Sequence, residues 1–84
     1  MASAGEWVRQ TVAKCHAEPM TTEAVLKSLE KYVGHGERAL GRTQEVLDYL
    51  DRQLIERNDG PVMRALWSTV ADYCEKVQEG LAAA

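Results

Sequence analysis

A chain of 84 residues, 45% hydrophobic and 27% charged, has the composition of one small globular domain rather than of a disordered segment. The formal net charge of −3 argues against a nucleic-acid-binding protein or one drawn to anionic membranes, because both usually carry a positive surface. No apolar run approaches the roughly 18 residues of a membrane-spanning helix. Two prolines, no phenylalanine and many good helix formers predict an all-α fold, a small antiparallel helical bundle in a single domain covering residues 1–84.

The first predicted helix covers residues 4–17. Ser3 and Glu6 have the spacing of a capping box, in which the two side chains satisfy free backbone amides at the start of a helix. Pro19 should end the helix, because proline disfavours the helical conformation in the residue before it.

The second predicted helix covers residues 22–33, with Thr21 as its N-cap, and the third covers residues 37–57. Gly34 and Gly36 lie between them. Glycine inside a helix costs about 1 kcal/mol relative to alanine, so we interpret the two glycines as a hinge where the chain breaks or kinks.

A second interpretation of this region stays open. The apolar positions keep a seven-residue repeat through the glycines, from Leu26 to Leu54, although a loop does not need to preserve this phase. Residues 22–57 would then form one long kinked helix. Because 84 residues cannot cover a helix of that length, this alternative requires a partner chain.

The fourth predicted helix covers residues 61–79. Asn58 and Asp59 should end the preceding helix, and Pro61 suits the first position of a new one. Gly80 is the expected C-terminal stop.

The stretch GERALGRT, residues 36–43, differs by one residue from the phosphate-binding loop G-x-x-x-x-G-K-[ST]. Arg42 replaces the lysine that would contact the phosphates. The segment before Gly36 also has helical periodicity where that loop requires a buried strand. We therefore interpret these glycines as helix punctuation, and we expect no nucleotide or other cofactor.

The sequence predicts neither a metal site nor a catalytic site. His16, His35, Cys15 and Cys74 do not have the local spacing that favours zinc binding. Both cysteines fall on predicted apolar faces, so we expect core side chains, with a disulfide between them as the alternative. The paired carboxylates lie off the apolar stripes, where helices ordinarily contact water. These carboxylates are Asp48, Asp51, Asp72 and Glu75.

Two surfaces are candidates for binding a partner. The third and fourth helices carry apolar stripes wider than one antiparallel neighbour can cover. The candidate partner interface that results consists of Trp67, Cys74, Leu81, Val46 and Ile55. A basic row would share one face of a continuous helix and could dock an acidic partner. That row consists of Lys27, Lys31, Arg38 and Arg42.

By elimination, the sequence predicts a non-enzymatic helical module for protein–protein interaction, such as an adaptor, chaperone, regulator or small assembly subunit. The partner would be another protein or a second copy of the chain, a homodimer included, and neither nucleic acid nor a membrane. The N-terminal stretch lacks the pattern of a signal peptide, so we expect a cytoplasmic protein. Two alternatives remain, a small helical enzyme or ligand-binding bundle with its site between helices, and a homo-oligomeric structural subunit. The ends of the sequence leave open whether it is part of a longer protein.

Overall fold

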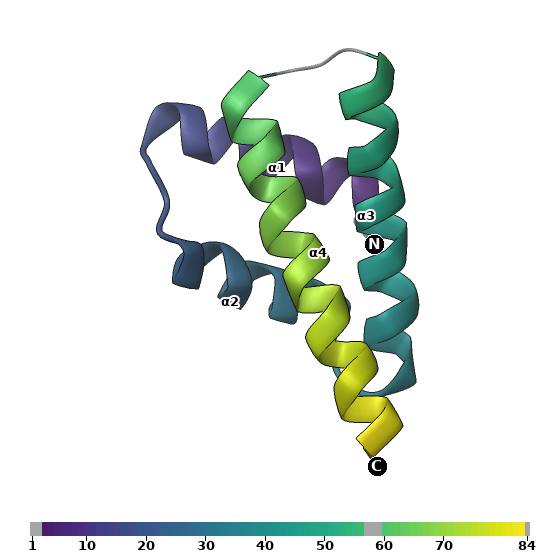
Figure 1. Cartoon of the computed structure of the whole chain (residues 1–84). Coiled ribbons are helices and arrows are strands. Elements are labelled where there is room, and N and C mark those ends of the chain that lie inside the picture. Colours follow the sequence, from purple (N-terminus) through teal and green to yellow (C-terminus); the bar gives the residue numbers. More distant parts are fainter. Residues whose placement is uncertain (1–2, 57–59, 84) are drawn as a thin grey trace.

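The computed structural model describes residues 3–56 and 60–83 (Figure 1). This part of the chain contains four α-helices and no strand, which confirms the predicted all-α fold. The helices are α1 (Ala4–Ala17), α2 (Thr22–Val33), α3 (Glu37–Glu56) and α4 (Gly60–Ala83).

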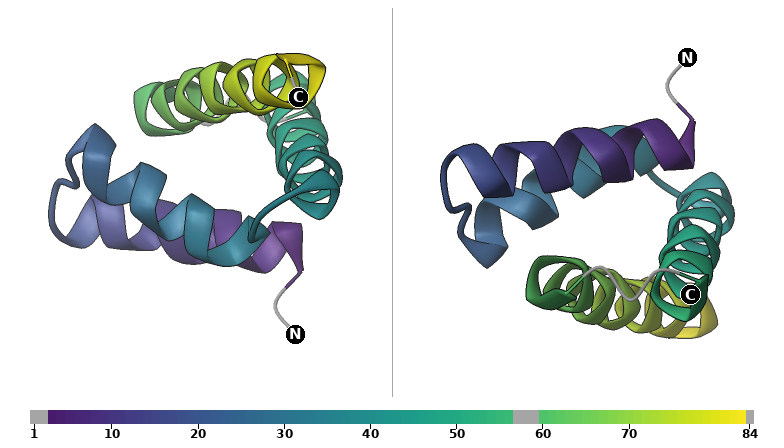
Figure 2. Two further views of the ribbon diagram at one scale, coloured as in Figure 1. Left: turned by 90° about the horizontal axis from the view of Figure 1, so that it is seen from below. Right: turned by 90° about the horizontal axis from the view of Figure 1, so that it is seen from above.

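The four helices form two antiparallel pairs that cross each other. α1 and α2 run in opposite directions on either side of the turn at Pro19, and α3 and α4 form the second, longer pair (Figure 1). Seen nearly along α3, the α1–α2 pair and α4 lie on opposite sides of the molecule, and α3 closes one edge (Figure 2). α3 makes its most extensive contacts with α4 and also touches both α1 and α2.

The core lies where the two pairs cross, and all four helices contribute to it. Its largest fully buried side chains are 1% exposed or less, and they are Leu29, Leu50, Val8, Val33, Val46 and Val70. Thr43 is also fully buried, and its hydroxyl donates to the carbonyl oxygen of Ala39. This bond satisfies the hydroxyl, which would otherwise destabilise an apolar core.

Aromatic and polar contacts join α1, α2 and α3. The indole N–H of Trp7 donates to the hydroxyl of Ser28 at 3.2 Å, and the indole stacks on Tyr32 with ring centroids 6.2 Å apart. Arg42 reaches back from α3, where Nη1 donates to the backbone carbonyl of Tyr32 at 3.0 Å. Its guanidinium lies 6.0 Å from the centre of the Tyr32 ring, within cation–π range. These contacts fix how α2 meets α3.

The helical conformation is interrupted between α2 and α3, at the predicted glycines. Gly34 has φ 76° and ψ −148°, and Gly36 has φ 75°, conformations that residues with a side chain rarely adopt. The hinge is therefore confirmed, and the single helix over residues 22–57 is not formed. Residues of the repeat on both sides of the break, Leu29 and Val33 on α2 and Leu50 on α3, belong to the same core.

α4 extends further than predicted. It continues through Gly80 to Ala83, so the prediction that Gly80 ends it is wrong. Gly80 does not adopt a positive φ, and one glycine inside a helix costs only about 1 kcal/mol. α4 begins at Gly60, one residue before the predicted start. The expected stop at Asn58 and Asp59 lies outside the described residues.

Gly41 offers a test of which glycines serve a structural purpose. It lies inside α3, and a Cβ added there would meet nothing within 4 Å. We therefore expect Gly41→Ala to raise the free energy of unfolding by about 1 kcal/mol, measured by urea denaturation. Gly5 is the contrast, since its added Cβ would lie 3.0 Å from Cε2 of Tyr49. A similar gain for Gly5→Ala would contradict the tight contact between α1 and α3.

Candidate functional site

An open groove of about 520 Å³ runs between α3 and α4, and its described lining comes from these two helices alone. Gln44 and Gln78 take part in the lining, and the other side chains are of two chemical kinds. The apolar ones are Leu47, Ala71 and Cys74, and the acidic ones are Asp48, Asp72 and Glu75. The groove therefore combines apolar contact area with a concentration of negative charge.

Cys74 reports on the electrostatics of this groove. Its side chain is 6% exposed. Burial raises the pKa of its thiol, and the negative charges of Asp48 and Glu75 raise it further. The negative charge of these carboxylates therefore affects Cys74, a nearly buried side chain in the lining of the groove.

Trp67 and Ile55 extend the groove by two helical turns. Trp67 precedes Ala71 by four residues on α4, and Asp51 follows Leu47 by four on α3, so each lies one turn further along the same face. The indole N–H of Trp67 donates to Oδ1 of Asp51, which ties the two helices together at this point. Ile55 lies one turn beyond Asp51 and is 84% exposed. We call the groove together with Asp51, Ile55 and Trp67 the outer face.

The structure places four of the five residues of the candidate partner interface along the antiparallel pair of α3 and α4. Ile55, Trp67 and Leu81 are exposed large hydrophobic side chains, and Leu81 lies three residues beyond the groove-lining Gln78. Cys74 lines the groove but is nearly buried. Val46 is 0% exposed and belongs to the core, so the prediction that it lies on an exposed face is wrong. Val46 packs in the core cluster to which all four helices contribute.

The predicted basic row does not form one face. Lys27, Lys31 and Arg38 are exposed, but the chain changes direction at Gly34 and Gly36, between the second and third of them. Arg42 is half-buried and bound to the carbonyl of Tyr32. The four residues would share one face only on a continuous helix, and α2 and α3 are separate helices.

The sequence marks the acidic residues of the groove only as paired carboxylates on solvated helix faces, and not as part of a binding surface. Asp48, Asp72 and Glu75 have the spacing of solvated helix positions, and nothing local distinguishes them from other surface carboxylates. One signal was present: Asp48 adjoins Leu47 and Asp72 adjoins Ala71, at the edge of each helix's apolar stripe. Recognising it required knowing that α3 and α4 turn these edges toward each other.

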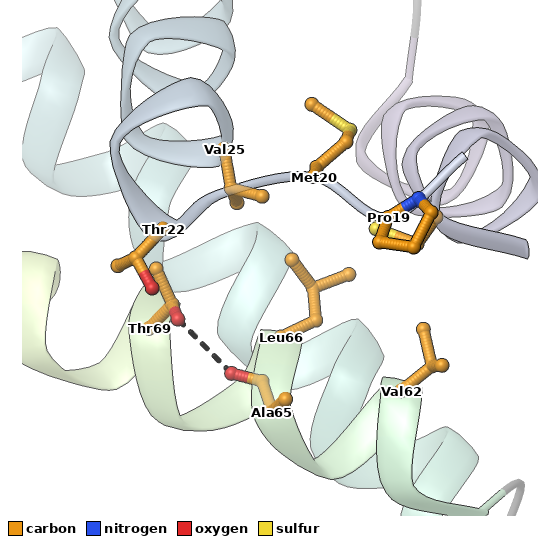
Figure 3. Close-up of a pocket in the computed structure, with 9 residues that line it drawn as sticks. Pro19, Met20, Thr22, Val25, Val62, Ala65, Leu66 and Thr69 are labelled. Atoms are coloured by element: carbon orange, nitrogen blue, oxygen red, sulfur yellow. Dashed lines mark hydrogen bonds between the residues drawn. The ribbon is translucent and has the colours of Figure 1, made fainter.

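A second cavity, of about 230 Å³, lies between the α1–α2 turn and the first half of α4 (Figure 3). Pro19 and Met20 form one side, and Val62 and Leu66 form the other. The hydroxyl of Thr69 donates to the carbonyl of Ala65 in its own helix, at 3.0 Å. With that hydroxyl engaged, the wall of the cavity is mainly apolar.

Cys15 and Cys74 are both free thiols, so the alternative of a disulfide is not formed. Cys15 is half-buried and lines the second cavity. Within residues 3–56 and 60–83, no cluster of three or more His, Cys, Asp or Glu side chains is placed to hold a metal ion. No helix in that part of the chain combines the length and the apolar character needed to cross a membrane.

The two thiols should differ in reactivity. We expect iodoacetamide to modify Cys15 about tenfold faster than Cys74 or more, because the thiolate is the reactive form and Cys74 is both buried and raised in pKa. The measurement is a time course of labelling at mildly alkaline pH, with each site quantified by mass spectrometry after digestion. Equal rates in the folded protein would contradict the burial of Cys74.

Alkaline pH should destabilise the fold. Burial raises the pKa of the Cys74 thiol above its ordinary value of 9.0, and those of Tyr32 and Tyr73 above 10.0. Above these values the unfolded chain loses protons that the folded chain keeps, so stability falls as pH rises. We expect a lower midpoint of urea unfolding at about pH 10.5 than at about pH 8. A constant midpoint would contradict this prediction.

The outer face and the second cavity are thus two of the hollowed surfaces that the described residues form, beside one of about 460 Å³ at the α1–α2 turn and one of about 330 Å³ between α1, α3 and α4. Comparison of the chain with models of protein families, with curated proteins and with solved structures found no match.

Proposed function

We propose that this protein is a helical protein–protein interaction module that binds its partner through the outer face. The observation that carries the proposal is the exposure of Ile55 (84%) and Trp67 (36%) beside an open groove with an apolar floor. Isolated apolar side chains are normal on protein surfaces, but large exposed ones on the same two helices as an open groove favour a binding site. Full burial of the Ile55 side chain by a partner would contribute about 1.5–3 kcal/mol.

The outer face is prepared for binding before a partner arrives. The hydrogen bond from the Trp67 indole to Asp51 holds the ring in one orientation. Little side-chain entropy is therefore lost when a partner covers the ring. Tryptophan is also among the residue types most enriched where binding energy concentrates. A groove between two antiparallel helices suits a third helix, which would insert apolar side chains at successive turns.

Site-specific crosslinking tests this proposal. A photoreactive residue at position 55 should give a covalent adduct with one partner in an extract of the protein's own cells, and excess unlabelled protein should suppress it. The matched control carries the same residue at position 27, an exposed site on α2. Equal adducts from both positions, or none from position 55, would refute docking through the outer face. An adduct of two copies of the chain would favour the homo-oligomeric subunit instead.

The second cavity supports a second candidate function, the binding of a small apolar ligand. Its lining of Pro19, Met20, Val62 and Leu66 offers apolar contact on two sides (Figure 3). Its volume of about 230 Å³ lies below the roughly 300–1,000 Å³ of usual small-molecule sites, so it suits only a short apolar group. Titration with octanoate should then shift the NMR signals of the backbone amides of Val25 and Leu66, which line this cavity. Unchanged amides at saturating octanoate would exclude this candidate.

A further inference from the structure

The chemistry of the outer face identifies a kind of partner, on the premise of the docking function proposed above. We infer that the outer face binds a basic amphipathic helix. Apolar side chains of that helix contact Leu47, Ala71 and Cys74, and its lysines and arginines face the carboxylates of the groove.

Charge complementarity is the first support for this partner. The described lining of the groove holds Asp48, Asp72 and Glu75 and no lysine, arginine or histidine. Arg52 and Lys76 each follow an aspartate of the groove by four residues, but both are exposed, and such surface pairs contribute only a few tenths of a kcal/mol. A partner that brings cations over the groove gains attraction to three carboxylates, whereas an acidic partner is repelled.

The length of the outer face fits a helix of about three turns. From Trp67 to Gln78 along α4 the distance is roughly 16 Å at 1.5 Å per residue. A partner helix lying in the groove would place apolar residues at intervals of three and four positions over this length, with basic residues on its flanks. Trp67, which is 36% exposed, can also attract a lysine or arginine by a cation–π contact.

A second copy of the chain fits the outer face poorly. If two copies met through this face, each would bring Asp48, Asp72 and Glu75 toward the other, and like charges oppose such contact. α2 of a second copy offers Lys27 and Lys31, but it also carries Glu23 and Glu30. Moreover, every exposed large hydrophobic side chain among the described residues lies on α3 or α4. α2 therefore supplies neither the net positive charge nor the exposed apolar residues of the expected partner.

A designed peptide pair tests the inference directly. The first peptide is an amphipathic helix of leucines at three- and four-residue intervals with lysines at the other positions, and the second carries glutamate in place of each lysine. We expect the lysine peptide to bind, with amide shifts in NMR spectra confined to the outer face and an affinity that falls as salt rises. The glutamate peptide should not bind.

Two charge-matched variants complete the test. Asp48→Asn with Asp72→Asn and Glu75→Gln removes the groove carboxylates with little change of shape, and should weaken binding of the lysine peptide about tenfold or more. The control variant removes three exposed carboxylates elsewhere and should bind like the unmodified protein. Its substitutions are Glu18→Gln, Glu23→Gln and Glu37→Gln.

Three results would overturn the inference: equal binding of the two peptides, equal weakening in both variants, or amide shifts centred on the second cavity. Failure of the inference can be told apart from failure of the docking function. If position 55 crosslinks to a partner segment that is neutral or acidic, the basic helix is wrong and the docking function stands. If position 55 gives no specific adduct, the docking function itself fails.

Discussion

Replacing Leu50 with alanine is expected to lower the free energy of unfolding by about 3–4 kcal/mol, within the range of roughly 2–5 kcal/mol for such core truncations. Leu50 is 0% exposed and belongs to the cluster to which all four helices contribute. The substitution removes three carbon atoms and leaves a cavity that the surrounding side chains fill only in part. At roughly 0.05–0.15 kcal/mol per residue, a chain of this size has a stability of about 4–13 kcal/mol, so the loss is a large fraction of the total.

Ile55→Ala is the matched control for Leu50→Ala. It removes the same number of carbon atoms from the same helix, but at a side chain that is 84% exposed. We expect a change in unfolding free energy within about 0.5 kcal/mol, measured by urea denaturation of both variants. Similar losses at the two sites would mean that the outer face is covered in the folded protein. The control should also bind the lysine peptide more weakly at the outer face, which separates docking from folding.

The features that could be predicted from the sequence depend on residues close together in the chain. The hydroxyl of Ser3 accepts from the backbone N–H of Glu6 at 3.2 Å, and that of Thr21 accepts from the N–H of Ala24 at 3.1 Å. Both caps lie at the predicted helix starts. A cap is made within one helical turn, so the order of residues is enough to locate it.

The features that could not be predicted depend on which helix covers which stripe. Val46 and Ile55 both flank the main apolar seam of α3, yet one is 0% exposed and the other 84%. Which side of α3 the other helices cover distinguishes them, and that packing is set by contacts between residues distant in sequence. The same holds for Arg42, whose contact with Tyr32 depends on the angle at the hinge.

For the outer face, the sequence points to the apolar residues as a candidate interface and to the acidic residues only as solvated helix positions. Trp67 and Ile55 stood out because large apolar side chains beyond one seam are conspicuous in a helical pattern. Asp48 and Glu75 belong to different helices, and each by itself is an ordinary surface carboxylate. Their shared groove exists only because α3 and α4 pack as an antiparallel pair. Whether a partner occupies that groove stays a prediction.

The combined substitution Gly34→Ala and Gly36→Ala is expected to lower the unfolding free energy by about 2–4 kcal/mol, because a Cβ at a positive φ costs roughly 1–2 kcal/mol per residue. Gly34, at φ 76° and ψ −148°, lies in a region that is essentially restricted to glycine. A Cβ at either glycine meets no atom within 4 Å, so the cost is backbone strain rather than a steric clash.

The doubly substituted chain can relieve that strain by continuing α2 into α3, because the apolar repeat keeps its phase through residues 34–36 and alanine favours the helix. A straightened helix would carry α1 and α2 away from α3 and α4 and expose the core. Two copies could then restore the core by exchanging their α1–α2 pairs. We therefore expect light scattering to detect a species of twice the mass of the unmodified protein, formed in a concentration-dependent manner. Gly41→Ala, in open space within α3, should leave the mass unchanged. A double variant with unchanged mass and unchanged stability would show that the hinge does not depend on its glycines.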